Sequence, residues 1–269
     1  MNNMKQTLLY YALAFLSVYL FSCSNDQDVN SLLPDGMGLV NLNMESSTDI
    51  DIPIITKAKD LFADIDVNDF YVAITNREDH TSYKDFETYR ELHETSPLII
   101  PAGKYNVLAS SFPKKDTKVS AQPYFVGDMN FIVENQRTSD VKFKCTYQSI
   151  GVELRISDQF KALLESNPKN YAYEVTVYNG DTSWKFLKDE EEEEMDPGYF
   201  LDACNKLKVE VRVRLNSHNS WYPTRTFYFD NNKGEGECLL GEYYIINLDA
   251  GAEERSAFSL TTLMKEIKE

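Results

Sequence analysis

Nine short stretches of this chain alternate apolar and polar residues, and this pattern limits the fold more than any other feature of the sequence. An alternation with a period of two places every second side chain on one face of an extended strand, whereas an amphipathic helix repeats its apolar residues every three or four positions. One apolar face per strand is typical of antiparallel sheets that cover a core on one side. The stretches are residues 39–44, 70–74, 105–109, 141–145, 152–156, 173–177, 207–213, 227–229 and 244–248. The sequence therefore predicts an all-β protein.

Helical patterns are rare in the chain. The segment 157–166 (SDQFKALLES) places Phe160, Leu163 and Leu164 on one helical face, and Ser157 is suited to cap its first turn. The C-terminal residues 260–269 are a second candidate helix. We expect these helices to be minor additions to the sheets.

Four strand-like segments recur in the same order in the second half of the chain, which predicts an internal repeat. The matched pairs are 70–76 with 173–179, 81–84 with 182–185, 40–44 with 152–156, and 105–107 with 207–209, at offsets of 103, 101, 112 and 102. The repeat predicts two tandem antiparallel β-sandwich domains, at residues 37–147 and 148–269. Each is close to the ~100 residues of an immunoglobulin-like sandwich. One long sandwich with similar hairpins is the alternative.

The N-terminus reads as an export signal that ends in a lipidation site. Lys5 precedes an apolar run of 14 residues, Leu8 to Phe21. That run is shorter than the ~20 residues of a membrane-spanning helix and fits the apolar region of a signal peptide. The run leads into Leu20-Phe21-Ser22-Cys23, which resembles the lipobox of bacterial lipoproteins. We therefore expect residues 1–22 to be a cleaved signal peptide, with an ordinary secretory signal as the alternative.

Lipidation at Cys23 would make the membrane a partner of the mature chain. Each buried CH₂ of an acyl chain contributes about 0.8 kcal/mol, so a multiply acylated cysteine holds a protein on a bilayer without a spanning helix. Residues 23–36 would form the lipidated tether, and Ser24 to Asp28 resembles the acidic export tag of surface-exposed Bacteroidetes lipoproteins. This interpretation predicts an outer-membrane protein on the cell surface. A plain flexible tether and a periplasmic location stay open.

Acidic residues outnumber basic residues by 43 to 27, which gives a net charge of −16 and a pI near 4.7. Such a chain repels phosphate, so we expect no nucleic-acid partner. The segment Asp189 to Asp196 (DEEEEEMD) contains seven carboxylates. Calcium binding is one interpretation. A solvated loop between strands is favoured, because no spacing of the acids orders them as metal ligands.

Residue sets for catalysis were not found, and we expect neither an enzyme nor a cofactor nor a metal site. The histidines at 80, 93 and 218 are far apart and form no metal-binding pair. Cleavage before Cys23 would leave three further cysteines, Cys145, Cys204 and Cys238, and none stands in a CxxC motif. Three cysteines allow at most one internal bridge, whose existence stays open. Cys145 lies in a strand pattern and is expected to be a small buried apolar residue.

Aromatic residues at the ends of loops are the candidate ligand-binding residues. Trp221 and Tyr222 follow the polar turn 217–220, and Trp184 follows the polar residues 181–183. Indole and phenol rings at such places can stack on sugars or anchor a protein partner. Filling of the core is the alternative for each. Trp184 occupies the repeat position of Tyr83, which favours a shared packing role.

Several short segments of the chain resemble those of a family of uncharacterised Bacteroidetes lipoproteins. They are the lipobox, the strand 38–42 (GLVNL), the turn 101–107 (PAGKYNV), the segment 123–127 (PYFVG) and the strand that contains Cys145. That family is similar in plan to the fimbrillin superfamily, whose members carry two transthyretin-like β-sandwich domains and serve as pilus or adhesin components. The resemblance implies a structural or adhesive role at the cell surface and no catalysis.

Two functional hypotheses follow. The first is a fimbrillin-like adhesin or a pilus tip or accessory component, with pilus subunits or host protein as partners and binding through loops or by strand addition at a sheet edge. The second is a surface glycan-binding lipoprotein of a nutrient uptake system, in which Trp221 or Tyr222 is the stacking platform.

Overall fold

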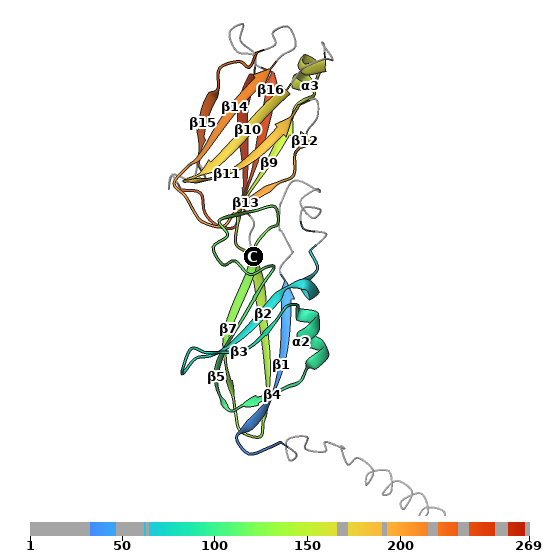
Figure 1. The fold of residues 1–269 in the computed structure, drawn as a ribbon, viewed down its shortest axis with the longest axis vertical. Helices are drawn as coiled ribbons and strands as arrows, with labels where there is room; N and C mark the ends of the chain where they lie inside the picture. Colours follow the sequence, from blue (N-terminus) through green and yellow to red (C-terminus); the bar gives the residue numbers. More distant parts are fainter. Residues whose placement is uncertain are drawn as a thin grey trace, which may run out of the picture.

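The computed structural model describes residues 33–46, 62, 65–165, 172–189, 193–214, 220–230, 237–250 and 258–266. Figure 1 shows these residues as two layered β bodies that are stacked end to end along the long axis of the molecule. The segments 1–32, 47–61 and 251–257 lie outside the described residues. The predicted signal peptide, Cys23 and most of the tether are therefore not described.

The first body is built on one seven-stranded sheet, in the order β3-β2-β5-β7-β8-β1-β4. Its elements are β1 (Met37–Ser46), η3 (Val67–Asp69), β2 (Tyr71–Asn76), β3 (Ser82–Phe86), α2 (Tyr89–Thr95), β4 (Leu98–Pro101), β5 (Gly103–Ser110), β7 (Phe125–Val133) and β8 (Thr138–Tyr147). The registered pairing of β7 with β8 is limited to Phe125 with Tyr147 and Val126 with Thr146. The sheet folds over at this point, so that its two parts enclose a core that contains Val72, Ile74 and Phe125.

The second body has two five-stranded sheets, in the orders β12-β11-β10-β14-β15 and β17-β16-β9-β13-β6. Its elements are β6 (Val119–Ser120), β9 (Ile150–Ile156), α3 (Asp158–Glu165), β10 (Ala172–Asn179), β11 (Thr182–Lys188), β12 (Glu193–Glu194), β13 (Gly198–Phe200), β14 (Leu207–Arg214), β15 (Arg225–Phe229), β16 (Glu242–Ala250) and β17 (Phe258–Glu266). Buried apolar side chains from both sheets, among them Val175, Val211 and Ile246, form a second core.

Equivalent strands pair in the same way in the two bodies, as the internal repeat leads one to expect. The hairpin β2–β3 corresponds to β10–β11, and the strand beside it is β5 in one body and β14 in the other. The pairing of β1 with β8 likewise corresponds to that of β9 with β16. These last two pairings are parallel. The all-β fold is confirmed, and its sheets are mixed where the sequence indicated antiparallel pairing alone.

The two bodies share a packed junction. β6 comes from the connection between β5 and β7, yet it pairs with β13 of the second body. Tyr147 lies against Tyr199, and Tyr199 against Tyr243, each pair with ring centroids 6.4 Å apart. All three tyrosines are buried and belong to the first core, although two of them come from strands of the second body. The junction is therefore continuous with the apolar interior.

All nine predicted strands are present, and Cys145 is fully buried as expected. The helix expected at 157–166 is α3, and Ser157 Oγ accepts a hydrogen bond from the N–H of Phe160 at 3.0 Å, as its capping role requires. The sequence pattern did not indicate α2, which Thr88 caps.

Two further expectations are wrong. The tail expected as a helix is the strand β17, which pairs with β16 through nine registered residues from Phe258 to Glu266. Pairing along a whole strand outweighs a weak helical propensity. Within the acidic run, Glu193 and Glu194 form the edge strand β12 rather than a loop, although both side chains are exposed as expected.

None of the helices in the described part of the chain is long and apolar enough to cross a membrane.

Candidate functional site

The outer face of β14 carries a row of charged side chains. Residues Leu207 to Arg214 alternate between buried and half-buried positions, with Val209, Val211 and Val213 directed into the core. Since side chains alternate across a strand, the residues between these valines lie together on the outer face. They are Lys208, Glu210, Arg212 and Arg214.

The C-terminal end of β14 lies at the end of the molecule that is remote from the first body. Leu201, shortly before β14, donates its N–H to the carbonyl of Lys118 in the connection from the first body, at 2.9 Å. Eight residues of strand then run away from this junction and cover about 23 Å. Figure 1 shows α3 at this far end, while β4 and the start of β1 lie at the opposite end.

Trp221 and Tyr222 lie beside this end of β14. The N–H of Tyr222 donates to the carbonyl of Val213 at 2.8 Å. This bond continues the ladder between β14 and β15 beyond its last registered pair, Val211 with Arg225. The structure therefore places both predicted residues next to Arg212 and Arg214.

The indole of Trp221 is half-buried against two guanidinium groups. The guanidinium carbon of Arg212 lies 4.7 Å from the centroid of the indole ring, and that of Arg214 lies 5.5 Å from it. Both distances are within the range of cation–π attraction. Arg212 also forms an ion pair with Glu174 at 2.8 Å. We call these residues, Trp221, Tyr222, Arg212, Arg214 and Glu174, the distal surface.

The distal surface combines a flat aromatic group with fixed positive charge. An indole presents an apolar face to the C–H groups of a sugar or to a protein side chain. A guanidinium group adds hydrogen-bond donors with the geometry that carboxylates accept. In a chain with a net charge of −16, two adjacent arginines form a local exception to the acidic surface. The chemistry available here is binding rather than bond cleavage.

A second polar group lies on the same face of the sheet, nearer the junction. The Lys208 ammonium lies 4.0 Å from the centroid of the Tyr178 ring and 2.9 Å from Glu210. The hydrogen bond between Lys208 and Glu210 raises the pKa of the lysine and lowers that of the carboxylate. Tyr228, opposite Lys208 on β15, is 64% exposed. This group extends the polar and aromatic outer face along the sheet.

Trp184 lies on the inner face of the same sheet. It pairs with Val177, whose side chain belongs to the second core. Its indole Nε1 donates to the carbonyl of Asp196 at 3.0 Å. A Cβ added at Gly198 would lie 2.2 Å from the ring, so the absence of a side chain there is what admits the indole. These contacts occupy Trp184 in packing, and its ligand-binding role stays a prediction.

Tyr83, the repeat counterpart of Trp184, lies on the corresponding strand β3. Its ring meets Tyr105 edge-on, with centroids 5.8 Å apart, and its side chain is 39% exposed. Tyr83 and Trp184 thus each pack on aromatic or apolar neighbours within their own body. The Tyr83 side chain is nevertheless exposed.

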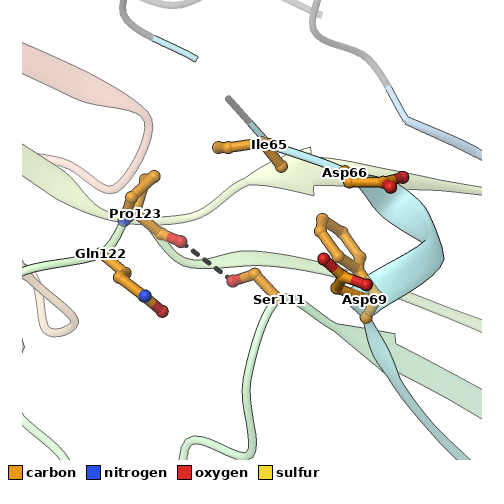
Figure 2. Close-up of a pocket in the computed structure, with 7 residues that line it drawn as sticks. Ile65, Asp66, Asp69, Ser111, Gln122 and Pro123 are labelled. Carbon is orange, nitrogen blue, oxygen red and sulfur yellow. Dashed lines mark hydrogen bonds between the residues drawn. The ribbon is translucent and has the colours of Figure 1, made fainter. Parts of the chain in front are cut away.

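An open cavity of about 290 Å³ lies beside the junction, and Figure 2 shows the residues that line it. Its serine and aspartate side chains have partners within the protein. Ser111 Oγ donates to the carbonyl of Pro123 at 2.9 Å. Arg90 forms ion pairs with Asp66 and Asp69 at 3.5 and 3.3 Å. The lining offers no unpaired nucleophile or acid–base pair, so we assign it no chemistry.

No group of three or more metal-ligating side chains occurs in the part of the chain that the structure describes. The predicted lipidation site, Cys23, lies outside that part.

The sequence pattern did not identify Arg212 and Arg214 as members of the site. The alternation in KVEVRVR already placed them on one face of a strand. Their approach to Trp221 could not be foreseen, because it depends on where Trp221 and Tyr222 lie beside the end of β14.

Comparison with known protein families gives one match over most of the chain. A family model described as "Domain of unknown function (DUF4493)" matches residues 36–267. No curated protein matches the chain at a significant level.

Several solved structures of bacterial proteins are similar at low identity. A "putative cell adhesion protein" from Bacteroides eggerthii covers 87% of this chain and 96% of its own, with 8% identity and a TM-score of 0.47. The fimbrial anchor protein Mfa2 from Porphyromonas gingivalis covers 85% and 97%, with 10% identity and a TM-score of 0.40. A fimbrial assembly protein from Parabacteroides distasonis covers 87% and 96%, with 14% identity and a TM-score of 0.41. All three TM-scores are below 0.5, so these matches establish neither a common fold nor a common function.

Proposed function

The chain belongs to the DUF4493 family, and on that premise we propose that it is a lipid-anchored cell-surface protein with a structural or adhesive role. The observation that carries the proposal is the apolar run that ends in Leu20-Phe21-Ser22-Cys23. An acylated cysteine at this position would attach the mature chain to a membrane.

The arrangement of the two bodies supports a role in which one end is tethered and the other is presented. β1 begins at Met37, only 14 residues after Cys23, at the end of the molecule remote from the distal surface. A tether that enters there would leave the distal surface facing away from the membrane. The packed junction would keep the two bodies aligned.

The binding modes open to an adhesive protein of this shape are loops and sheet edges. The described part of β17 pairs with β16 on one side, over nine residues. No other described strand pairs with β17, so its outer edge is the longest site for strand addition among the described sheets. The partners we propose are other pilus subunits or a host protein.

The fimbrillin-like plan implied by the sequence also favours this role. The proteins named above are described as adhesion and fimbrial proteins, in keeping with the proposal, although their TM-scores are too low to carry it. We further propose that residues 37–147 and 148–269 are two domains. β8 ends at Tyr147 and β9 begins at Ile150, which supports that boundary, while the pairing of β6 with β13 ties the two together.

The anchoring is tested by replacing Cys23 with Ser in the full-length protein. The natural protein should incorporate labelled fatty acid, whereas Cys23→Ser should not. Ser22→Ala is the matched control, because it keeps a small residue before the cysteine and should anchor normally. Fatty acid incorporated equally by Cys23→Ser would refute lipidation at this residue.

Surface exposure is tested on intact cells treated with protease. The proposal expects the protein to be removed while a periplasmic marker stays intact. Protection of the protein in intact cells, with digestion after the outer membrane is opened, would place it on the periplasmic face and overturn the surface role.

The alternative function is capture of glycans for a nutrient uptake system, and the half-buried indole at the distal surface favours it. Polysaccharide binding should be lost in Trp221→Ala and largely kept in Trp221→Phe, which retains an aromatic face. Tyr228→Ala, an exposed aromatic residue of the same sheet, is the control. Equal binding by Trp221→Ala and the natural protein would exclude this surface as a glycan platform.

A further inference from the structure

Cys204 and Cys238 lie directly opposite each other in an isolated antiparallel bridge. The N–H of Cys204 donates to the carbonyl of Cys238 at 3.1 Å, and the N–H of Cys238 donates to the carbonyl of Cys204 at 2.6 Å. Residues that exchange both bonds have Cα atoms about 5.5 Å apart. Disulfides commonly join Cα atoms separated by about 4.4–6.8 Å. The backbone spacing therefore suits a disulfide without rearrangement.

The side chains are also correctly placed. Residues directly opposite in an antiparallel pair project from the same side of the ladder. Both cysteines are thiols in the structure, and the Cys238 thiol donates to the carbonyl of Phe229 at 3.6 Å. The neighbouring Cys204 side chain lowers the pKa of Cys238, which favours the thiolate that attacks disulfides. Cys238 is buried and Cys204 is half-buried, so an oxidant can reach the pair through Cys204.

Cys145 is in a different position. Its side chain is fully buried in the first core, where its sulfur lies 3.5 Å from Met44 Sδ. Burial raises the pKa of the Cys145 thiol to about 12. Neither Cys204 nor Cys238 belongs to that core. Of the three cysteines in the two bodies, Cys145 is therefore the one that we expect to stay a thiol.

We propose that Cys204 and Cys238 form a disulfide in the mature protein, an inference that rests on the export in our proposed function. The oxidant is a protein dithiol–disulfide carrier of the compartment outside the cytoplasmic membrane. The thiolate of one cysteine attacks the carrier disulfide and forms a mixed disulfide, and the thiolate of the other displaces the carrier. One S–S bond forms in this chain and one breaks in the carrier, which leaves as a dithiol with the two electrons and two protons.

The disulfide would hold in place the segment of the second body that Lys114 of the first body contacts. Cys204 closely follows Leu201 and Asp202. The Lys114 ammonium, from the first body, donates to the carbonyl of Leu201 at 2.8 Å and pairs with Asp202 at 3.3 Å. Asn179 donates to the carbonyl of Asp202 at 2.6 Å. A covalent link from Cys204 to the segment before β16 would hold this docking segment in place, so the disulfide would stiffen the junction.

The test uses the purified full-length protein in a glutathione redox buffer, followed by alkylation and peptide mapping. We expect a mass about 2 Da lower than that of the reduced protein, through loss of two hydrogen atoms, and a linked peptide containing Cys204 and Cys238. Cys145→Ser should form the same link, whereas Cys204→Ser and Cys238→Ser should not. Alkylation of both cysteines in the oxidised sample, or a link to Cys145 or Cys23 instead, would overturn the proposal.

Thermal unfolding supplies a second readout that needs no variant. Closure of the ring that contains β14 and β15 should raise the Tm by about 7–15 °C, so a reductant should lower it by that amount. An unchanged Tm after verified reduction would contradict the expected stabilisation by the disulfide. Because glutathione replaces the cellular oxidant, this test does not depend on export, and Cys23→Ser tests export separately.

Discussion

Replacement of Gly151 by Ala is expected to destabilise the junction between the two bodies. Gly151 lies in β9, where it pairs with Tyr199 on one side and Tyr243 on the other. A Cβ at this position would lie 2.2 and 2.6 Å from two carbons of the Tyr243 ring and 2.7 Å from the Tyr147 hydroxyl. Carbon atoms pack best at about 3.5–4.0 Å, so the ring would have to move by more than about 1 Å.

The size of the effect follows from the freedom of these rings. Tyr243 is fully buried, and its hydroxyl donates to Glu153 Oε2 at 3.2 Å, so the ring has little space into which it can shift. Overpacking of this kind costs about 1–3 kcal/mol. The substitution also lowers the conformational entropy of the unfolded chain, which stabilises the folded protein by about 0.4–1 kcal/mol. We expect a net loss of about 1–2 kcal/mol, or a Tm lower by about 2–8 °C.

Gly103→Ala is the matched control for thermal and urea unfolding of Gly151→Ala. A Cβ at Gly103 would meet nothing closer than a Tyr105 ring carbon at 3.5 Å, which is ordinary contact. This variant should be neutral or more stable by about 0.4–1 kcal/mol. In a Tyr243→Leu background, which removes the ring, the cost of Gly151→Ala should shrink. Equal stability of the two alanine variants would refute the close packing at the junction.

Three further predictions concern the same regions. Gly198→Ala should lower the free energy of unfolding, measured by urea unfolding, by about 1–2 kcal/mol after the same subtraction, because the new Cβ would lie 2.2 Å from the Trp184 indole. Lys114→Ala should change the Tm by less than about 2 °C, since both members of its ion pair are more than a third exposed, yet amide exchange at Leu201 should become faster. Burial raises the pKa of Tyr199 to about 12, whereas a tyrosine of the unfolded chain titrates near 10. The stabilisation that this shift provides is complete below about pH 10 and is lost as the pH rises towards 12. In Tyr199→Phe the free energy of unfolding, measured as a function of pH, should therefore decline less over this range, by up to about 2–3 kcal/mol.

The strands could be predicted because each depends on local information. Alternation of apolar and polar residues identifies the inner face of a strand without knowledge of its partner, as Val209, Val211 and Val213 show. The cap at Ser157 was predictable for the same reason, because donor and acceptor lie three residues apart. The repeat was visible because equivalent strands keep the same apolar pattern.

The tail and the parallel pairs show where local information ends. Residues 260–266 can be arranged on a helix or a strand, and the adjacent edge of β16 decides between them. Whether β8 runs parallel or antiparallel to β1 leaves its own alternation unchanged, so the sequence carries no signal for it.

In the candidate site, too, some residues could be predicted from the sequence and others only from the structure. Its aromatic residues could be named from the sequence, since Trp221 and Tyr222 follow a polar turn. The contacts of Arg212 and Arg214 with Trp221 depend on how the segment before β15 lies beside β14, and the approach of Cys204 to Cys238 joins residues that are far apart along the chain.

The sequence by itself thus determined which residues face a core and which element most segments form, because these depend on spacing along a few residues. The tertiary structure alone decided strand partners, the packed tyrosines of the junction and the contacts of the distal surface. These depend on distances through space between residues that no local pattern relates.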